Sequence, residues 1–253
     1  MSTKPRILFF DIETSPTIGY TWGLWQQNVI STAKEWEILS FAWKWANEKT
    51  THCRSRIDFK DQSTDVFLLA ELWDLLDSAD IVIAHNGNDF DIKKSNARFL
   101  VQGLPPPSPY ISIDTKLVAR RYFKFNSNSL DALGKLLKCG QKLKHTGFDL
   151  WLGCMSGNKK SWKLMIKYNK QDVKLLEQVY LKLRPWINNH PNHSNQVPGK
   201  PAGCPKCGSL LLKSCGYRHT KTSSYLQWRC LDCKGYCRSQ KAEKIIKPKV
   251  VNL

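Results

Sequence analysis

The segment Arg6–Thr14, with the sequence RILFFDIET, decides the predicted fold of this chain. Its apolar run Ile7–Phe10 ends in a carboxylate, a pattern that suits a central strand of a β-sheet. Because residues i and i+2 of a strand point to the same face, Asp11 and Glu13 are expected to project together near the end of this strand. An acidic pair beside large apolar side chains is unfavourable unless a cation neutralises it. Considered without the rest of the sequence, however, two acids in this pattern are more often solvent-exposed residues at the end of a strand than ligands of a cation.

The sequence around this strand indicates an α/β domain. Residues 37–45, 50–57, 80–84 and 111–113 have the composition of strands, whereas 66–76, 92–101 and 161–183 have helical periodicity. Ser129 is expected to cap a further helix, which begins with the sequence LDALGKLL. Because three early strands precede alternating helices and strands, we expect a mixed β-sheet flanked by helices.

The chain of 253 residues is strongly basic, with 39 Lys and Arg against 21 Asp and Glu and a formal charge of +18. Such an excess concerns binding partners more than fold, and nucleic acid is the commonest cellular polyanion. The alternative is a generally basic, soluble surface. The sequence has neither an apolar run of about eighteen residues nor a secretion signal at its start. We therefore expect a cytoplasmic protein with no membrane partner.

The composition changes after residue 186. Residues 187–203 are polar and rich in Asn, Pro and Gly, as linkers are. Residues 196–253 contain 12 Lys and Arg but only 2 Asp and Glu, whereas the preceding 195 residues contain 27 and 19. We therefore expect a large α/β domain over residues 1–186, a linker over 187–203 and a small basic domain over 204–253.

Two further acidic motifs follow in the predicted α/β domain. The sequence HNGNDFD, residues 85–91, comes directly after the strand 80–84 and would place its side chains at a sheet edge, where α/β proteins keep their sites. In the long helix, Tyr168 and Asp172 are four residues apart and therefore share one face. Each motif has an ordinary alternative: an Asn/Gly turn with Asp89 as a helix cap in the first, and an exposed surface pair in the second.

Together and in this order, DIET, HNGNDFD and YNKQD resemble the three exonuclease motifs of the DEDD superfamily. The tyrosine marks the DEDDy branch of DnaQ-like, RNase H-like 3′–5′ exonucleases, and the resemblance covers about residues 6–186. It implies that two Mg²⁺ or Mn²⁺ ions are held by four acids and that Tyr168 positions the attacking water or helps to activate it. Carboxylate oxygens suit these hard cations better than Zn²⁺. The four implied acids are Asp11, Glu13, Asp91 and Asp172.

The resemblance also implies looser assignments around these acids. Asp91 is preferred to Asp89 as the metal ligand because it follows Phe90, as the family pattern requires. Residues 124–131 lie where the family often contacts the substrate strand. His85 is interpreted as a structural neighbour of the site and His145 as a surface histidine. The candidate substrate contacts are Asn86, Asn128 and Ser129.

Two tryptophans follow DIET in a Gly-containing segment that would overhang the metal site. Trp22 and Trp25 could stack against a terminal base of a nucleic acid. We expect them instead to pack in the core or in a lid.

The cysteines predict a second metal site. Of nine cysteines, six lie between Cys204 and Cys237, and four of these form two CxxC motifs separated by 22 residues. Two such motifs supply the four thiolates of a closed, structural Zn²⁺ site, and the sequence CPKCG resembles the knuckle of a zinc ribbon. A pair of structural disulfides is the alternative. The expected ligands are Cys204, Cys207, Cys230 and Cys233, with Cys215 and Cys237 as spare thiols.

The predicted ribbon contains aromatic residues interleaved with cations, an arrangement that suits single-stranded nucleic acid. Residues 210–215 and 224–229 are expected to form its paired strands. The run 241–249 would add attraction that does not depend on sequence. The candidate contacts in the ribbon are Arg218, Lys221, Trp228 and Arg229.

These observations predict a metal-dependent 3′–5′ exonuclease that acts on DNA rather than RNA, at single-stranded or frayed 3′ ends. The alternatives are an exoribonuclease or a structure-specific endonuclease on the same fold, or a non-catalytic nucleic-acid-binding accessory protein of replication. The arrangement looks like that of phage-borne exonucleases, which would act in the host cytoplasm. The partners expected besides nucleic acid are replication or recombination proteins.

Overall fold

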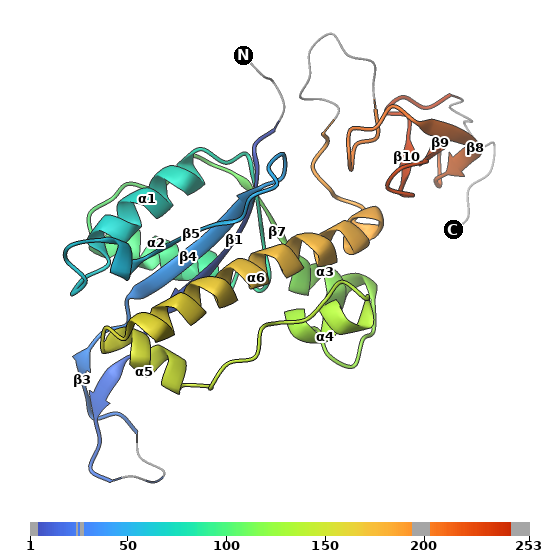
Figure 1. The fold of residues 1–253 in the computed structure, drawn as a ribbon. Coiled ribbons are helices and arrows are strands. Elements are labelled where there is room, and N and C mark those ends of the chain that lie inside the picture. Colours follow the sequence, from blue (N-terminus) through green and yellow to red (C-terminus); the bar gives the residue numbers. More distant parts are fainter. Residues whose placement is uncertain (1–4, 24, 26–27, 194–202, 244–253) are drawn as a thin grey trace. The chain divides into compact units, whose positions relative to one another are not determined.

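The computed structural model describes residues 5–23, 25, 28–193 and 203–243 (Figure 1). The chain divides into two compact units, Arg6–Val179 and a second unit formed by Tyr180–Leu253 with Met1–Pro5. Residues 194–202 of the predicted linker and 244–249 of the predicted basic run lie outside the described residues. Within the described part of the chain, no helix has the length and apolar character needed to cross a membrane.

The larger unit is built on a five-stranded mixed sheet with the strand order β5–β4–β1–β6–β7. The central strand β1 pairs antiparallel with β4 and parallel with β6. At the two edges, β5 is antiparallel to β4 and β7 is parallel to β6. The predicted mixed sheet with RILFFD in its central strand is therefore confirmed. The strands are β1 (Ile7–Thr14), β4 (Ile38–Trp45), β5 (His52–Ser55), β6 (Ile81–Ala84) and β7 (Ile111–Asp114).

Helices cover both faces of this sheet. On one face, α1 and α2 bury the apolar side chains Leu8, Phe10 and Ile12 of β1. On the other face, α5 and α6 pack on Leu39 of β4. The helices are α1 (Val66–Asp77), α2 (Asp91–Val101), α3 (Thr115–Tyr122), α4 (Leu130–Leu136), α5 (Asp149–Met155) and α6 (Lys159–Leu183), with short 3-10 turns η1 (Arg56–Asp58) and η2 (Arg184–Trp186).

The long helix α6 carries the third acidic motif. It begins after Asn158, whose side-chain oxygen accepts hydrogen bonds from the backbone N–H groups of Lys160 and Ser161 at 2.9 and 3.2 Å. It ends at Leu183 and continues into η2, which contains Pro185. Because Asp11 and Glu13 are out of phase with Leu8, Phe10 and Ile12 along β1, they face the side of the sheet on which α6 lies.

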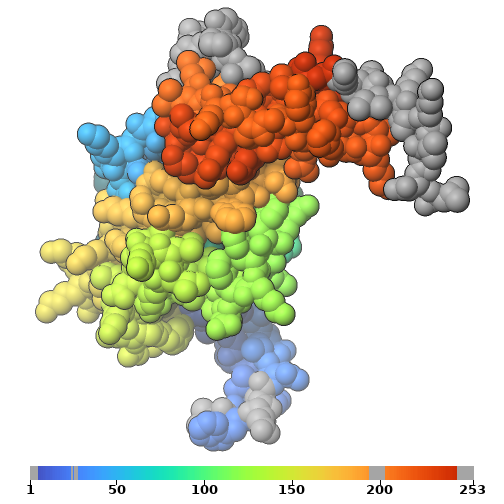
Figure 2. Space-filling model, turned by 90° about the vertical axis from the view of Figure 1, so that its right-hand side faces the viewer, coloured from blue at the N-terminus to red at the C-terminus, as the bar shows by residue number. Residues whose placement is uncertain are grey.

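A two-stranded hairpin interrupts the chain between β1 and β4. Its strands β2 (Ile18–Tyr20) and β3 (Ser31–Lys34) pair antiparallel, and the hairpin projects from the larger unit in both views (Figures 1 and 2). The sequence predicts a loop here, and it predicts that Trp22 and Trp25 pack in the core or a lid. The packing prediction is wrong, because both side chains are exposed.

The smaller unit contains a three-stranded antiparallel sheet in the order β10–β9–β8. The predicted pair of strands is confirmed as β8 (Leu212–His219) and β9 (Ser224–Cys230), whereas β10 (Tyr236–Arg238) is additional. The register of β8 shifts between Ser214 and Tyr217, where Gly216 has a φ of 85°. A residue with a side chain would be strained in this left-handed conformation. The core of this sheet is a cluster of cysteines rather than aliphatic side chains.

Candidate active site and cysteine cluster

The predicted acids meet near the carboxyl end of β1. One carboxylate oxygen from each of Asp11, Glu13 and Asp172 lies within 4.8 Å of the others. Asp91 begins α2, and its Oδ1 accepts a hydrogen bond of 2.9 Å from the backbone N–H of Ile12, the residue between the two acids of β1. The fold therefore brings together acids that are up to 161 positions apart in the sequence.

Burial and mutual repulsion raise the pKa values of these acids. Burial raises the pKa of Asp11 well above its ordinary value, and the neighbouring charges of Asp91 and Glu13 add to the effect. Burial and the charge of Asp172 raise the pKa of Glu13 to about 8. Burial raises the pKa of Asp91 to about 7, although the hydrogen bond from Ile12 opposes it. Such a group of carboxylates needs added positive charge to be fully ionised at neutral pH.

The donor set fits hard divalent cations. It consists of carboxylate oxygens, which Mg²⁺ and Mn²⁺ prefer. In addition, Asp172 Oδ1 is buried and has no hydrogen-bond partner within the described part of the chain. A buried carboxylate oxygen without a donor is unfavourable, and a bound cation would satisfy it.

Lys142 is part of this site, although the sequence gives no sign of it. Its ammonium donates hydrogen bonds to Asp172 Oδ2 at 2.6 Å and to the hydroxyl of Tyr168 at 2.9 Å. The backbone N–H of Lys142 donates to Asp131 of α4 at 2.9 Å, which fixes the loop that carries it. Burial alone would lower the pKa of Lys142, but the attraction of Asp172 outweighs it and raises the pKa above its ordinary value.

Tyr168 lies beside the acids in an aromatic cluster. Its ring meets the ring of His145 edge-on at 4.9 Å and that of Trp151 at 6.3 Å, measured between centroids. The expectation of a plain surface position for His145 is therefore wrong. Burial and the charge of Asp172 raise the pKa of Tyr168. Its protonated hydroxyl can orient a water molecule.

Asn169, within the YNKQD motif, contacts the acids, a role that the sequence does not predict. Its side chain is fully buried and donates a hydrogen bond of 2.7 Å to Asp11 Oδ2. Its Oδ1 accepts a hydrogen bond from the hydroxyl of Ser40 in β4 at 3.1 Å. This chain of hydrogen bonds fixes the orientation of the Asp11 carboxylate from α6 and β4 together.

The HNGNDFD segment forms a tight turn before α2. Asn86 has a φ of 69°, a conformation that Asn tolerates better than most residues. The backbone N–H groups of Asn86 and Asn88 donate to the buried carboxylate of Asp114, which also caps α3. The side-chain oxygen of Asn86 accepts a hydrogen bond from Lys116 at 3.1 Å. Asp89 is exposed and forms an ion pair with Lys93, as suits a turn residue.

Several polar groups near this turn form hydrogen bonds within the protein. His85 lies within hydrogen-bond distance of Thr115 and of the backbone oxygen of Asn128, both at 2.9 Å. Burial lowers its pKa to about 4, so His85 is neutral at pH 7. Ser129 caps α4 by accepting a hydrogen bond from Ala132 at 3.3 Å, as its sequence position predicts. Asn128 Oδ1 is buried without a partner among the described residues.

The four cysteines of the CxxC motifs lie together in the smaller unit. Their Sγ atoms are within 4.8 Å of one another, with 3.6 Å between Cys204 and Cys233 and 3.7 Å between Cys207 and Cys230. Tetrahedral zinc with Zn–S bonds of about 2.3 Å would place the sulfur atoms about 3.8 Å apart. A disulfide requires about 2.0 Å, so the sulfur geometry fits zinc and not disulfides.

The strand register separates the candidate contacts of the ribbon onto two faces of its sheet. Arg218 is paired with Tyr225, and Arg229 is paired with both Lys213 and Tyr236. Paired residues share a face, and alternate residues of β9 share one as well. We call this the cationic face, and Arg238 stacks on it 3.8 Å above the ring of Tyr225. Trp228 points to the opposite face, and Lys221 lies in the β8–β9 turn.

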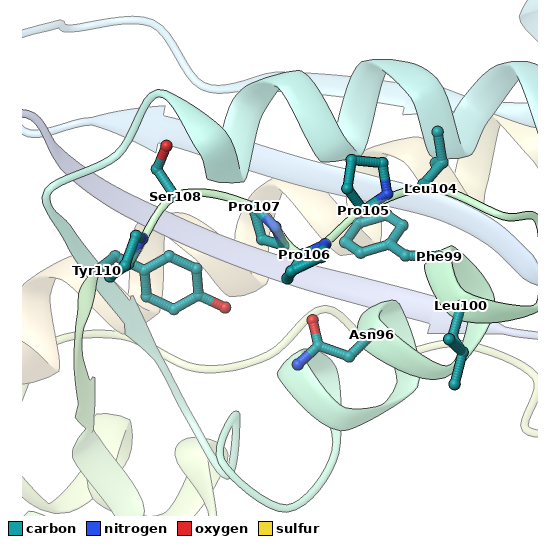
Figure 3. Close-up of a pocket in the computed structure, with 10 residues that line it drawn as sticks. Asn96, Phe99, Leu100, Leu104, Pro105, Pro106, Pro107, Ser108 and Tyr110 are labelled. Carbon is teal, nitrogen blue, oxygen red and sulfur yellow. The ribbon is translucent and has the colours of Figure 1, made fainter.

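A hollow of about 420 Å³ lies elsewhere on the larger unit (Figure 3). Its wall consists of the proline-rich segment 105–109 with Phe99, Leu104 and Tyr110. None of its lining residues is acidic, so this hollow offers no carboxylate ligands for a cation. The acids, rather than this pocket, therefore form the candidate site.

Comparisons with known proteins agree with this architecture. The family model for the RNase H superfamily matches residues 8–184. A solved structure of the family B DNA polymerase from the hyperthermophilic archaeon Pyrobaculum calidifontis is similar, with a TM-score of 0.55 and 14% sequence identity. The similarity covers 72% of this chain but only 25% of that polymerase chain, and it concerns the fold alone. No curated protein sequence matches the chain.

Proposed function

The chain belongs to the RNase H superfamily, and we propose that it is a metal-dependent 3′–5′ exonuclease of the DEDDy type that acts on DNA. The observation that carries the proposal is the meeting of Asp11, Glu13 and Asp172 within 4.8 Å, with Asp91 held against Ile12. A nuclease fold with an oxygen-only donor group and an adjacent protonated tyrosine matches the requirements of phosphodiester hydrolysis.

Each residue of the site would have a distinct role in phosphodiester hydrolysis. Two divalent cations, when bound by the four acids, would supply charge stabilisation and lower the pKa of a bound water. Tyr168 would orient the attacking water through its hydroxyl, which Lys142 holds in place. Asn169 would keep the Asp11 carboxylate aimed at the metal. Lys142 would add positive charge next to the phosphate that is cleaved.

We propose DNA, at single-stranded or frayed 3′ ends, as the substrate, and two observations support a nucleic acid and DNA in particular. The formal charge of +18 favours a polyanion. The structurally similar protein is named as a DNA polymerase, that is, an enzyme that acts on DNA. We therefore also propose a replication or recombination protein as a partner. RNA as substrate, or an endonucleolytic mode of cleavage, would use the same acids and is distinguished by the experiment below.

We further propose that Cys204, Cys207, Cys230 and Cys233 bind one structural Zn²⁺ and that the smaller unit is a zinc ribbon. The sulfur separations of 3.6 and 3.7 Å support this ligand set. The cysteine cluster is the core of the sheet, so zinc would supply much of its folding free energy. The cationic face of this sheet would attract the substrate strand.

The proposal is tested with end-labelled substrates in Mg²⁺, Mn²⁺ or EDTA. A panel of single-stranded DNA, duplex DNA, DNA with a frayed 3′ end and RNA separates the possible substrates. We expect ladders that shorten from the 3′ end of DNA, no products in EDTA, and no activity of Asp11→Asn or Asp172→Asn. Asp89→Asn is the matched control and should retain activity, because its carboxylate pairs with Lys93 outside the site.

Internal cuts would instead indicate an endonuclease, and preferential shortening of RNA an exoribonuclease. Binding without cleavage by the metal-loaded wild-type protein would indicate a non-catalytic accessory protein. Activity of purified Asp172→Asn close to that of the wild type would overturn the assignment of the site.

A further inference from the structure

The β2–β3 hairpin exposes an unusual amount of apolar surface. Trp22 is 88% exposed and Trp25 is 82% exposed. Soluble proteins seldom expose contiguous apolar patches of this kind unless the patch binds something. Among the described residues of the hairpin, the other exposed apolar ones are Ile18, Tyr20, Val29 and Ile30.

The hairpin also differs in charge from the rest of the molecule. Residues 14–33 contain no acidic, basic or histidine side chain, although the chain as a whole carries 60 charged residues. The hairpin carries one charged residue, Lys34 at the end of β3, which is the strand partner of Ile18 and forms an ion pair of 3.1 Å with Glu37. Residues 14–33 themselves have no cation that could hold a phosphate and no acid that would repel one. Its three aromatic residues, Tyr20, Trp22 and Trp25, are instead suited to contact with the flat faces of bases.

The base of the hairpin is fixed to the strand that carries the acids. Thr14 of β1 and Ile38 of β4 are partners in the sheet, and the hairpin is inserted between them. Ser15 donates its backbone N–H to the carbonyl of Glu37 at 2.9 Å, and its hydroxyl accepts from the N–H of Glu37 at 2.9 Å. Because Ile18 follows Glu13 by five residues, the hairpin starts within about 18 Å of the acids.

We propose that this hairpin stacks its aromatic side chains on the end of a base-paired substrate and separates the 3′-terminal nucleotides from their partner strand. The separated strand would then reach the acids on β1. This inference rests on the proposed nuclease function and adds a substrate class to it: duplex ends rather than single strands alone. Stacking is tolerant of sequence, because every base presents a flat face.

Two observations favour nucleic acid, rather than an apolar groove of another protein, as the binding partner of the hairpin. The hairpin is continuous with the strand that carries Asp11 and Glu13, so a substrate that reaches these acids passes close to it. Between β2 and β3, the two tryptophans Trp22 and Trp25 are also more exposed (88% and 82%) than the aliphatic Val29 and Ile30 (58% and 52%). A protein partner is treated as a distinct outcome of the test.

The test compares the full-length wild-type protein with the double variant Trp22→Ala/Trp25→Ala. The substrates are one 5′-labelled strand used alone, annealed as a blunt duplex, and annealed with a mismatched 3′ end. We expect the variant to degrade the single strand within about twofold of the wild-type rate and the blunt duplex about tenfold more slowly. The mismatched end, which needs no separation, should recover most of the lost rate.

The matched control replaces two exposed apolar residues at the end of α2, Leu100 and Val101, by Ala. This variant should degrade all three substrates at the wild-type rate. Equal losses of the Trp22/Trp25 variant on single-stranded and duplex DNA, or no loss on the duplex, would overturn the proposal. Loss of self-association or of partner binding with unchanged duplex degradation would assign the hairpin to protein docking and likewise overturn it.

A second measurement separates this inference from the nuclease proposal. The Asp172→Asn variant is mixed with a duplex that carries 2-aminopurine at its 3′ end, whose fluorescence rises when the base unstacks. We expect a rise with this variant and none when Trp22→Ala/Trp25→Ala is added to it. A rise of equal size in both proteins would overturn the hairpin proposal, whether or not the wild-type protein hydrolyses DNA.

Discussion

Lys142 Nζ lies 2.6 Å from Asp172 Oδ2, so a side chain of the protein itself supplies positive charge to the buried acids. Asp172 is almost completely buried, whereas about a third of the Lys142 side chain is exposed. A divalent cation bound by Asp172 would take over part of this neutralisation. The lysine and the metal are therefore expected to stabilise the same carboxylate.

Replacement of Lys142 by Met is expected to destabilise the protein in EDTA by about 2 kcal/mol, because it removes a charged donor and leaves a buried carboxylate unpaired. Saturating Mg²⁺ should restore most of the loss. The measurement is thermal or urea unfolding with and without Mg²⁺. Lys135→Met, which breaks an exposed ion pair with Asp131, is the control and should cost less than about 0.5 kcal/mol. Equal stability of the two variants in EDTA would refute the role of Lys142.

The stability of the metal-free protein should fall as the pH rises. The pKa of Glu13 is about 8 in the folded protein against an ordinary value of 4.5, because burial and Asp172 favour the protonated form. The folded state thus holds this proton more tightly than the unfolded state. The resulting stabilisation is fully present below pH 4.5 and is lost as the pH rises through about 8. Urea unfolding in EDTA measures it, and Glu13→Gln should show a flatter pH profile. Identical profiles for the two proteins would contradict this.

Asn169→Ala should lower activity about 10- to 100-fold and raise the Mg²⁺ concentration needed for half-maximal rate, since residues that orient metal ligands commonly have effects of this size. Ser40→Ala removes only the hydrogen bond to Asn169 and should have a smaller effect in the same direction. Metal titrations of the rate measure both. If Asn169→Ala slowed the reaction without changing the Mg²⁺ requirement, Asn169 would not act through Asp11.

The cationic face of the smaller unit should dominate its electrostatic contribution to DNA binding. Arg218→Ala and Arg238→Ala should each weaken binding of single-stranded DNA and reduce the salt dependence of log K by about 1. Fluorescence anisotropy with the Asp172→Asn protein, which does not cleave, measures this at several salt concentrations. Lys49→Ala, in the exposed β4–β5 turn, should leave the salt dependence unchanged. A slope equal to that of the parent protein in both arginine variants would contradict the assignment.

The acids and the central sheet could be predicted from the sequence because each acidic motif is joined to a regular element. Asp11 and Glu13 follow the apolar run of β1, so strand alternation alone places them on one face. Tyr168 and Asp172 are one helical turn apart in α6, so they share a face whatever the helix packs against. These two local rules place Asp11, Glu13, Tyr168 and Asp172 on their elements, whereas the choice of Asp91 depends on the resemblance to the DEDD motifs.

Lys142 and the hairpin could not be predicted because their roles depend on packing between distant segments. Lys142 reaches Asp172 across 30 positions, from a loop without periodicity. The uncharged segment 14–33, which lies between β1 and β4, looks like one that is buried, and only the completed fold shows that its tryptophans Trp22 and Trp25 are exposed. The register of β8 is likewise fixed by a bulge at Gly216, which a local pattern does not reveal.

The most direct test of the shared metal site is Mn²⁺ binding to the full chain, followed by electron paramagnetic resonance of the free ion. We expect about two Mn²⁺ ions per wild-type chain and binding at least about tenfold weaker in Asp172→Asn. Asp89→Asn should bind like the wild type. A folded wild-type protein that binds no Mn²⁺, or an Asp172→Asn protein that binds it as tightly as the wild type, would contradict the account.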